Sequence, residues 1–366
     1  MFSAADHAFM AEALRLAERG LYTTDPNPHV GCVLVKDGNI IGRGFHRRAG
    51  EAHAEVNALK QAGDDARGAT VYVTLEPCAH FGRTGPCADA LVQANVARVI
   101  AAMADPNPQV AGKGFEKLQA AGIETAAGLL ETETRALNPG FVSRMTRGRP
   151  WVRSKLAVSL DGRTALASGA SKWISGEAAR EDAQRWRARS SAILTGIGTL
   201  LADDPALSVR LPGEWRQPRR IVVDSQLRTP ADARLLKQAG ETLIATLVAD
   251  AGRHATLVAA GAAIMVLPAA DGHVDLAALM RQLAASGCNE VLVEAGAVLN
   301  GALLKAGLLD ELVIYMAPQL LGDTARGMFD LPALDSLEER VELQLKDVRM
   351  LGVDVRFVAV PQARKS

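Results

Sequence analysis

The sequence is poor in cysteine, in aromatic residues and in net charge. Four of its 366 residues are cysteines, aromatic residues make up 4% of the chain, and 41 basic side chains balance 41 acidic ones. So few cysteines in a chain of this length do not form a disulfide scaffold, and we expect a reducing, cytoplasmic location. Without a basic excess, nucleic acid is not expected as a partner.

Long hydrophobic runs are absent as well. No apolar stretch approaches the roughly 18 residues that a membrane span needs. The first residues lack the basic start, apolar middle and cleavage site of a signal peptide, so we expect no membrane partner. The N-terminus instead predicts an amphipathic helix that Ser3 caps and Gly20 ends. Its inward-facing residues are predicted to be Phe9, Ala13, Leu14 and Ala17.

Apolar strands alternate with helices along the whole chain, in two blocks. With 366 residues, 48% of them hydrophobic, the chain is longer than a single core usually supports. The stretch "SRMTRGRPW", residues 143–151, interrupts the alternation with basic residues, Gly148 and Pro150. We expect one domain in residues 1–147 and another in residues 150–366. Each is predicted to be α/β, with a mostly parallel sheet covered by helices.

Two antiparallel hairpins are predicted within this alternation. The first spans residues 29–46, where Asp37 and Gly38 form a turn between two apolar strands. The second, residues 342–360, ends the second block. The first block continues with elements predicted at residues 54–63 (helix), 69–77 (strand), 87–96 (helix) and 97–103 (strand).

A His-x-Glu sequence and two Pro-Cys sequences form the most specific pattern. His53 and Glu55 start one predicted helix, while Cys78 and Cys87 lie where a strand gives way to the next helix. Catalytic zinc takes three protein ligands and keeps a fourth place for water, and His53, Cys78 and Cys87 supply three. Glu55 follows His53 at roughly 200° around a helix. It is therefore expected to reach the metal-bound water as a proton carrier and not to ligate the ion.

Other interpretations of these residues remain open. The thiols and the imidazole could be ordinary packing residues, or His80 could close a structural zinc site as a fourth ligand. Cys32 and Cys288 lie in apolar contexts and are expected to be inert. His-x-Glu followed by Pro-Cys and Cys is typical of zinc deaminases, whose common spacing has two residues between the cysteines. The eight residues found here count against a generic cytidine or tRNA deaminase.

The first block resembles the deaminase half of the bifunctional deaminase–reductase family of riboflavin biosynthesis. The segments that carry the resemblance are residues 26–38, 44–59, 68–91 and 105–114. The resemblance implies a cytidine-deaminase-like three-layer fold and a pocket for a pyrimidine that carries a ribose phosphate. It also implies that Asn27, in "PNPHVG", contacts the substrate, although an asparagine between two prolines can equally be a turn residue.

The second block says less by itself. In "VLVEAGAVLNGALL", residues 291–304, an apolar strand is followed by a Gly turn and a helix whose first N–H groups can hold a phosphate. The segment is not Gly-x-Gly-x-x-Gly, so a dinucleotide fingerprint is absent and simple turn chemistry remains an alternative. The residues alone predict an α/β domain that can bind phosphate.

The resemblance extends into this block through residues 155–165, 168–176, 193–210, 220–230 and 293–318. It implies a dihydrofolate-reductase-like α/β domain that uses NADPH. The positions that fall on the family's cofactor residues are Ala157, Trp173, Thr199, Asp203, Ser225, Gly296, Ala297, Val298, Leu299, Asn300, Gly301 and Ala302. Those that fall on its substrate residues are Lys155, Ser171, Arg187, Leu207, Arg210 and Glu294.

The residue types suit these roles. Arg187 and Arg210 are permanent cations with a planar donor fork, and they could hold the 5′-phosphate of the substrate. Arg187 could equally belong to the solvated face of a charged helix, and Trp173 could be core. Glu294 ends a strand, where a carboxylate meets what the following turn binds.

The resemblance implies two consecutive reactions. The first domain would remove the exocyclic amine of 2,5-diamino-6-ribosylamino-4(3H)-pyrimidinone 5′-phosphate with one Zn²⁺ per chain. The second would use NADPH to reduce the ribosyl chain of 5-amino-6-(5-phosphoribosylamino)uracil to ribityl. A small molecule is the expected partner, and the sequence leaves a homo-oligomer open. The alternatives are a nucleoside or nucleic-acid zinc deaminase with an unrelated C-terminal domain, and a zinc-stabilised binding module without catalysis.

Overall fold

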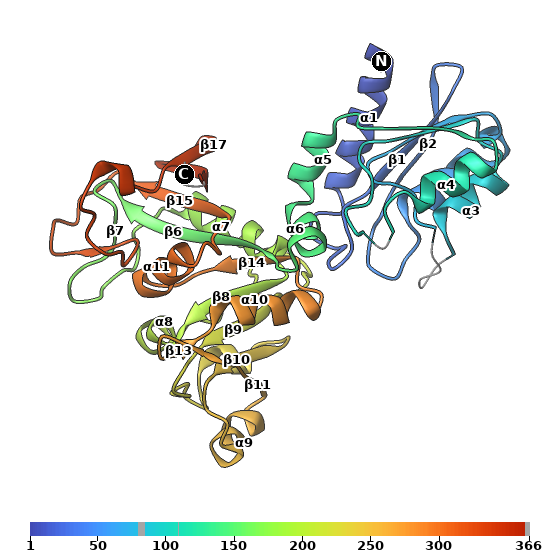
Figure 1. The fold of residues 1–366 in the computed structure, drawn as a ribbon. Coiled ribbons are helices and arrows are strands. Elements are labelled where there is room, and N and C mark those ends of the chain that lie inside the picture. The colour runs from blue at the N-terminus through green and yellow to red at the C-terminus, as the bar shows by residue number, and fades with distance from the viewer. Residues whose placement is uncertain (80–84, 109, 363–366) are drawn as a thin grey trace. The chain divides into compact units, whose positions relative to one another are not determined.

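The computed structural model describes residues 1–79, 85–108 and 110–362. The chain divides into two compact units, Met1–Gly148 and Arg149–Ser366, which are coloured blue to green and green to red in Figure 1. The predicted break at residues 143–151 is mostly helical, because α6 (Pro139–Arg147) runs up to Gly148, which ends it with a left-handed φ of 64°. Glycine adopts this conformation without steric cost.

A five-stranded sheet in the order β2-β1-β3-β4-β5 forms the centre of the first unit. The predicted hairpin is confirmed, and Asp37 and Gly38 both have positive φ, 51° and 75°, as its tight turn requires. The sheet is mixed, because β1 pairs antiparallel with both β2 and β3, whereas β3, β4 and β5 pair in parallel. The strands are β1 (Gly31–Lys36), β2 (Asn39–Phe45), β3 (Thr70–Val73), β4 (Arg98–Ala101) and β5 (Glu124–Ala127).

Helices cover both faces of this sheet. Along β1, Cys32 and Leu34 pack in one hydrophobic cluster with α2, α3 and α4, while Val33 and Val35 pack in another with α1. A strand buried on both faces in this way lies in the middle of three layers. The other helices are α1 (Ala4–Glu18), α2 (Ala54–Ala62), α3 (Cys87–Gln93), α4 (Lys113–Ala120) and α5 (Glu131–Leu137), with the 3₁₀ turn η1 (Gly63–Ala66).

The first helix differs slightly from its prediction. Ser3 caps α1 in a capping box with Asp6, as Ser3 was expected to do. The helix ends at Glu18, two residues before Gly20, and the predicted inward face is partly wrong. Leu14 and Phe9 are only half-buried. The fully covered residues are Met10, Ala13, Leu16 and Ala17, which follow a narrower stripe.

Glycines in β2 set how closely α2 approaches the sheet. A Cβ atom on Gly44 would lie 2.1 Å from the backbone oxygen of Ala54, and one on Gly42 would lie 2.4 Å from that of Ala58. No larger residue fits at either position without moving the helix. The start of α2, directly after His53, is therefore held against the strand.

The second unit contains a nine-stranded sheet in the order β11-β10-β9-β8-β14-β6-β15-β18-β17. The seven strands from β11 to β15 are parallel, and the predicted C-terminal hairpin, β17 and β18, is confirmed as an antiparallel edge. The strands are β6 (Trp151–Ser159), β8 (Ala192–Gly196), β9 (Arg219–Val223), β10 (Thr242–Thr246), β11 (Ala262–Val266), β14 (Glu290–Val293), β15 (Glu311–Ala317), β17 (Leu343–Leu351) and β18 (Asp354–Pro361). Two small ladders pair β7 (Arg163–Ala165) with β16 (Arg326–Gly327) and β12 (Ala269–Ala270) with β13 (His273–Val274).

The chain order of these strands creates a switch point. From β8 the chain adds β9, β10 and β11 on one side, and it then returns to place β14 between β8 and β6. Ligands of open α/β sheets bind outside the carboxyl ends of the strands at such a point. The helices that cover this sheet are α7 (Glu177–Arg189), α8 (Ile197–Asp203), α9 (Ala251–Ala259), α10 (Leu276–Ala285) and α11 (Ala297–Lys305), with the 3₁₀ turns η2 (Arg234–Lys237) and η3 (Leu337–Glu339).

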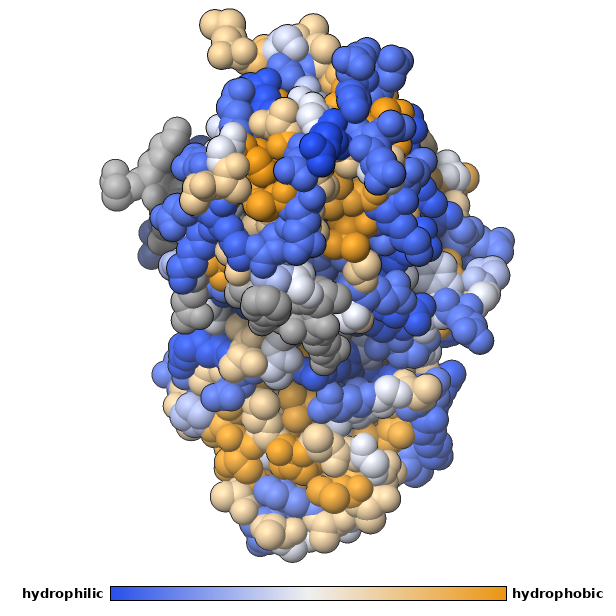
Figure 2. Space-filling view, turned by 90° about the vertical axis from the view of Figure 1, so that its right-hand side faces the viewer, coloured by the Kyte–Doolittle hydropathy of each residue, from blue (hydrophilic) through white to orange (hydrophobic). Residues whose placement is uncertain are grey.

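The surface is mixed in character. The face in Figure 2 carries hydrophilic residues over much of its area, with hydrophobic patches between them. Within residues 1–79, 85–108 and 110–362, no helix combines the length and the apolar character that crossing a membrane would require.

Candidate active sites

Three potential metal ligands converge in the first unit. The ligand atoms of His53, Cys78 and Cys87 all lie within 4.8 Å of one another, the one such cluster in the part of the chain that the structure describes. The Nδ1 atom of His53 lies 3.2 Å from Sγ of Cys87 and 3.6 Å from Sγ of Cys78. The structure thus brings together the three residues that the sequence singled out, across 25 to 34 positions of the chain.

The donor set fits zinc. Tetrahedral zinc with bonds of about 2.0 Å to nitrogen and 2.3 Å to sulfur requires nitrogen–sulfur separations of about 3.6 Å. The two distances found, 3.2 and 3.6 Å, are close to this value. Three ligands leave a fourth position, as in a catalytic site. His80, the alternative fourth ligand, lies outside the described residues.

The loops that present these ligands differ from their predicted places. His53 is the N-cap residue of α2 and not part of the helix, so the angular argument that separated it from Glu55 does not apply. Both cysteines had been expected where a strand gives way to a helix. Cys87 is indeed the first residue of α3, but Cys78 lies in the irregular segment after β3. Instead, the backbone N–H of Cys87 donates to Sγ of Cys78 at 3.2 Å. One helix start therefore serves both thiols.

The charges of the cluster are those of a cation site. A hydrogen bond from the Cys87 thiol, together with His53, lowers the pKa of Cys78, and the thiolate favoured there raises the pKa of Cys87. A divalent metal binds both sulfur atoms as thiolates, and its charge would compensate for the loss of the second proton. By contrast, burial raises the pKa of Cys32 well above its usual value, which fits the expectation that this thiol is inert.

Glu55 lies next to this cluster and is 3% exposed. Burial raises its pKa to about 7, and the charge of Cys78 acts in the same direction. A carboxyl group with a pKa near neutrality can both accept and release a proton at physiological pH. The burial of Glu55 and its raised pKa are compatible with the role of proton carrier that the sequence predicts.

Two further residues of this unit support the site, and neither was predicted from the sequence. Glu76 is 4% exposed and accepts hydrogen bonds from the N–H groups of Asp105, Gly112 and Gly114, at 2.9 to 3.0 Å. It thereby fastens the segment before Cys78 to the loop that leads into α4. A buried carboxylate directly before a Pro-Cys sequence was the available signal.

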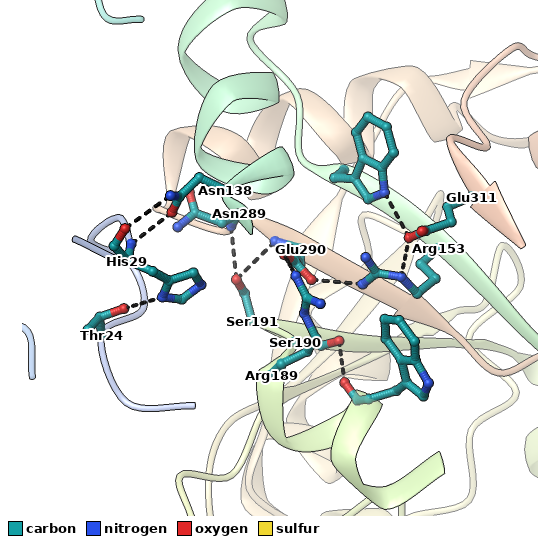
Figure 3. A network of polar contacts seen from close by, with 12 residues as sticks. Thr24, His29, Asn138, Arg153, Arg189, Ser190, Ser191, Asn289, Glu290 and Glu311 are labelled. Atoms are coloured by element: carbon teal, nitrogen blue, oxygen red, sulfur yellow. Dashed lines mark hydrogen bonds and ion pairs between the residues drawn. The ribbon is translucent and has the colours of Figure 1, made fainter. Parts of the chain in front are cut away.

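His46 is the second of these. Its Nε2 lies 3.0 Å from Nδ2 of Asn27, and its ring packs edge-on against that of His53 with 5.2 Å between centroids. Asn27 thus lies near the metal cluster. The loop that carries it is held by His29, whose backbone N–H and C=O both bond to the Asn138 side chain, as Figure 3 shows.

In the second unit, four of the predicted substrate residues form one charged group. Arg187 donates from Nε and Nη2 to the carboxylate of Glu294, at 2.6 and 2.8 Å, and from Nη1 to the Ser208 backbone oxygen at 2.9 Å. Arg187 is 9% exposed, so the alternative of a solvated helix face is wrong. Burial lowers the pKa of Lys155, while the charge of Glu294 acts in the opposite direction. Arg210 is close enough to Arg187 and Glu294 for both to affect its pKa.

Leu207 can contact a ligand only through its backbone. Its side chain is 2% exposed and packs in a hydrophobic cluster, so it cannot face a ligand. Its φ is 47°, an uncommon conformation for leucine. Its N–H and C=O make no hydrogen bond within the described residues. Ser171 lies half-buried in the loop between β7 and α7.

The predicted cofactor residues lie at the carboxyl ends of neighbouring strands. Ala157 lies on β6, Ser225 follows β9 and accepts from the Val274 N–H at 3.1 Å, and the Gly296 N–H donates to Oγ1 of Thr199 at 3.2 Å. Asp203 ends α8 and lies 3.8 Å from Lys172. Trp173 is 69% exposed, with Arg180 4.8 Å above its ring, so it is not a core residue.

The sequence predicted a Gly turn at this segment, but residues 296–302 form the start of a helix. Gly296 is the N-cap of α11, and Ala297, Val298, Leu299 and the residues after them are helical. Asn300 is fully buried and bonds to Ser154 and Ala295, and a Cβ atom on Gly301 would lie 2.2 Å from the Asp330 backbone oxygen. Only the first turn of the helix therefore offers free N–H groups to an anion. Asn300 and Gly301 pack that helix against its surroundings.

A buried ion-pair network lies near the opposite ends of β6 and β14. Arg153 is 1% exposed and binds Glu290 at 2.7 Å and Glu311 at 2.5 Å, while Arg189 binds Glu290 at 2.8 Å (Figure 3). Both Arg153 and Arg189 also lie against the Trp186 ring. No local sequence pattern predicts this network, because its members come from four separate elements.

Fold and sites together define a protein class: a zinc deaminase unit of three layers joined to a dihydrofolate-reductase-like unit. Comparison with known proteins agrees. Residues 3–103 match the cytidine and deoxycytidylate deaminase zinc-binding region, and residues 150–357 match the RibD C-terminal domain. The chain belongs to the RibD family of riboflavin biosynthesis proteins, bifunctional enzymes with a deaminase and a reductase activity that use Zn²⁺ and NADPH.

Individual relatives match along the full length. The riboflavin biosynthesis protein RibD of Escherichia coli is 52% identical, and the match covers 96% of this chain and 98% of that protein. The structure of RibD from Acinetobacter baumannii is 46% identical with a TM-score of 0.92, over 98% and 99% of the two chains. A diaminohydroxyphosphoribosylaminopyrimidine deaminase/5-amino-6-(5-phosphoribosylamino)uracil reductase from Thermotoga maritima is 31% identical with a TM-score of 0.86, over 98% and 99%.

Proposed function

We propose that this enzyme first deaminates 2,5-diamino-6-ribosylamino-4(3H)-pyrimidinone 5′-phosphate and then reduces the ribosyl chain of the product, 5-amino-6-(5-phosphoribosylamino)uracil, to ribityl. The observation that carries the proposal is the convergence of His53, Cys78 and Cys87 beside the buried carboxyl of Glu55, in a chain that also contains the reductase sheet. The printed name of the Thermotoga relative supports the two substrates. Residues 1–147 would perform the first reaction and residues 150–366 the second.

In the first reaction, His53, Cys78 and Cys87 hold the metal. A zinc ion bound there supplies Lewis acidity, which lowers the pKa of water toward about 7. Glu55 takes a proton from the attacking water and delivers it to the leaving amine, so that ammonia departs and a carbonyl replaces the C–N bond. Asn27 contacts the substrate, and its bond to His46 fixes the orientation of its amide.

In the second reaction, NADPH supplies the hydride. The first turn of α11 holds a phosphate of the cofactor through its N–H groups, and Thr199 holds that turn in place through Gly296. Trp173 presents an exposed ring to the cofactor, and Ala157, Asp203 and Ser225 complete its site. Glu294, directly after β14, and Lys155, in the middle of the neighbouring β6, orient the sugar chain, with Ser171, Arg187, Leu207 and Arg210 as further substrate contacts.

Product analysis tests the two-step assignment. The purified enzyme is incubated with the diaminopyrimidine substrate, with and without NADPH, and the products are identified by mass spectrometry. We expect the deaminated product without NADPH, and a product with two additional hydrogens when NADPH is present. An unchanged substrate in both incubations would refute the proposal, whereas deamination of an oligonucleotide would favour a nucleic-acid deaminase.

We also infer a cytoplasmic location. All four cysteines are free, and Cys78 and Cys87 lie close enough together to oxidise. A reducing compartment keeps such a pair available to a metal. Fractionation of cells with an antibody against the chain tests this, and recovery from an oxidising compartment would refute it.

Self-association through the C-terminal edge of the sheet is a further part of the proposal. Leu343, Leu345, Val348 and Met350 are 44 to 63% exposed, and their partners on β18 place them on one face. An unpaired edge strand with such a face suits pairing with a second copy of itself around a two-fold axis.

Light scattering on the purified chain tests this pairing. The wild type should have the mass of a dimer, and V348K together with M350K should yield a monomer. Val258→Lys, at a residue 54% exposed on α9, is the matched control and should leave the mass unchanged. A monomeric wild type would refute the pairing.

A further inference from the structure

A pocket that contains two arginines lies beside the charged group of the reductase unit. Its volume is about 320 Å³. Its wall includes two arginines, Arg210 and Arg234, and the hydroxyl-bearing Ser208. Arg234 was not among the residues that the sequence suggested, because it opens the short turn η2, about 24 positions after Arg210 and outside any recognisable phosphate pattern.

Neither arginine has a counter-ion among the residues that the structure describes. Within the described residues, no acidic side chain lies within ion-pair distance of either guanidinium, and neither side chain makes a hydrogen bond. Burial lowers the pKa of Arg210, and the charges of Arg187 and Arg234 act in the same direction. Two unpaired cations that face one pocket repel each other. An anion bound between them would remove this cost.

The remaining charges do not neutralise the pocket. The carboxylate of Glu294 is engaged by Nε and Nη2 of Arg187, so these two charges cancel each other. Asp204 accepts from the backbone N–H of Arg234 and not from its guanidinium. Arg210 and Arg234 therefore leave two positive charges, which match the dianion of a phosphomonoester.

The backbone around the pocket is held in place before any ligand arrives. The Gln217 side chain bonds to both the N–H and the C=O of Val209, at 2.9 and 3.3 Å, and Gln184 accepts from the Arg210 N–H at 2.9 Å. Ser208 has no partner for its hydroxyl among the described residues, so this group is available as a donor. A prearranged set of donors of this kind binds an anion without the cost of ordering it.

We propose that Arg234 is a substrate-binding residue of the reductase, and that Arg210 and Arg234 together hold the 5′-phosphate while Arg187 positions Glu294. The inference rests on the proposed function, since that function supplies a substrate with a phosphomonoester. NADPH carries a group of the same chemistry in its 2′-phosphate. The substrate is the ligand of this pocket because Arg210 is also close to Glu294, a proposed substrate residue.

The test compares phosphorylated and dephosphorylated substrate on the full-length enzyme. Loss of a charge-assisted contact corresponds to a factor of about 10 to 100. For Arg234→Ala we expect the KM of the phosphorylated substrate to rise by about this factor, with kcat, the Kd of NADPH and the Tm little changed. The kcat/KM of the dephosphorylated substrate should not change, and Arg234→Lys should restore part of the lost affinity. A merely structural role would affect both substrates alike.

Arg281→Ala is the matched control, since this arginine is 64% exposed on α10 and does not line the pocket. It should leave every constant unchanged. An unaltered KM in Arg234→Ala would overturn the proposal, and so would a loss of preference for NADPH over NADH, which would assign the pocket to the cofactor. Either result would leave the proposed function intact. A wild type that cannot reduce the substrate would instead refute the proposed function.

Discussion

The two units of this enzyme build their sites in different ways. In the deaminase unit, His53 and Glu55 lie at the start of α2, which packs closely on β2, and Cys87 starts α3 nine positions after Cys78. In the reductase unit, the site residues come from the carboxyl ends of β6, β8, β9 and β14 and from the loops after them. A metal site needs a few particular side chains, whereas a site for a cofactor and a sugar phosphate can use backbone groups of almost any sequence.

The two units also handle buried charge differently. The deaminase cluster combines two thiols with one imidazole, a donor set that suits a divalent cation. In the reductase unit, several buried charges are paired by other side chains of that unit, Arg187 by Glu294 and Arg153 by Glu290 and Glu311. Metal should therefore affect the first unit alone, and changes in the ion pairs should affect the second alone.

The largest expected effect is the loss of a metal ligand. Cys87→Ala removes a thiolate, so we expect zinc content and deamination both to fall to background, while reduction of the deaminated substrate with NADPH continues. Elemental analysis and separate assays of the two steps measure this. Loss of both activities in a folded variant would contradict the separation of the two sites.

Glu55→Gln should have the next largest effect. The amide cannot carry the proton but occupies the same volume, so deamination should fall by about 10²- to 10⁴-fold with zinc still bound. Zinc content and the reductase rate serve as internal controls. A variant that retains full deamination would show that another group moves the proton.

Glu290→Gln tests the ion-pair network of the second unit. It leaves Arg153 and Arg189 buried with reduced compensation, which costs about 3–5 kcal/mol of unfolding free energy. Calorimetry should show a lower Tm for the reductase transition and an unchanged one for the deaminase transition. Arg185→Ala, at an exposed pair on the same helix as Arg189, should change the Tm little. Equal shifts of both transitions would mean that the units do not unfold separately.

Acid should destabilise the same network. Burial alone would raise the pKa of Glu290, but Arg189 and Arg153 outweigh it and lower the pKa to about 2, from an ordinary value of 4.5. A carboxyl group whose pKa is lower in the folded than in the unfolded state stabilises the folded protein fully at any pH above the unfolded-state pKa. This contribution to the free energy of unfolding is lost as the pH falls from about 4.5 to 2. The loss is roughly 3 kcal/mol. Urea unfolding of the reductase unit over this pH range measures it, and Glu290→Gln should flatten the dependence.

The smallest effect is expected at the first turn of α11. Gly296 has an ordinary φ of −77°, and a Cβ atom there would meet only Oγ1 of Thr199, at 3.8 Å. Gly296→Ala should therefore fold normally. We expect the Kd of NADPH to rise by about 10-fold, because the added methyl group lies where the phosphate must approach the N–H groups of the first turn, with deamination unchanged. Calorimetric titration with NADPH measures this, and an unaltered Kd would place the cofactor phosphate elsewhere.

The sequence by itself predicted most strands of the two central sheets, though not β5 or β11, together with both hairpins and the candidate metal ligands. Alternating apolar residues predict strands because the side-chain period of a strand is local, and His53, Glu55, Cys78 and Cys87 are recognisable because zinc accepts few side chains. The predicted positions of the helix starts were less accurate. Whether His53 is the last residue before α2 or the first within it depends on how Gly44 packs against Ala54, and that contact spans separate elements.

Only the tertiary structure decided which charges pair. Arg187 reads as one charge among many on a helix until the fold places Glu294 beside it, and Arg234 carries no signal until its loop closes on Arg210. The same holds for Glu76, which meets three N–H groups from a loop about 30 positions away. Coulomb energies and hydrogen bonds depend on distance in space, and neighbours in space are not neighbours in the chain. Chain folding, and not residue type, therefore assigns a partner to each buried charge.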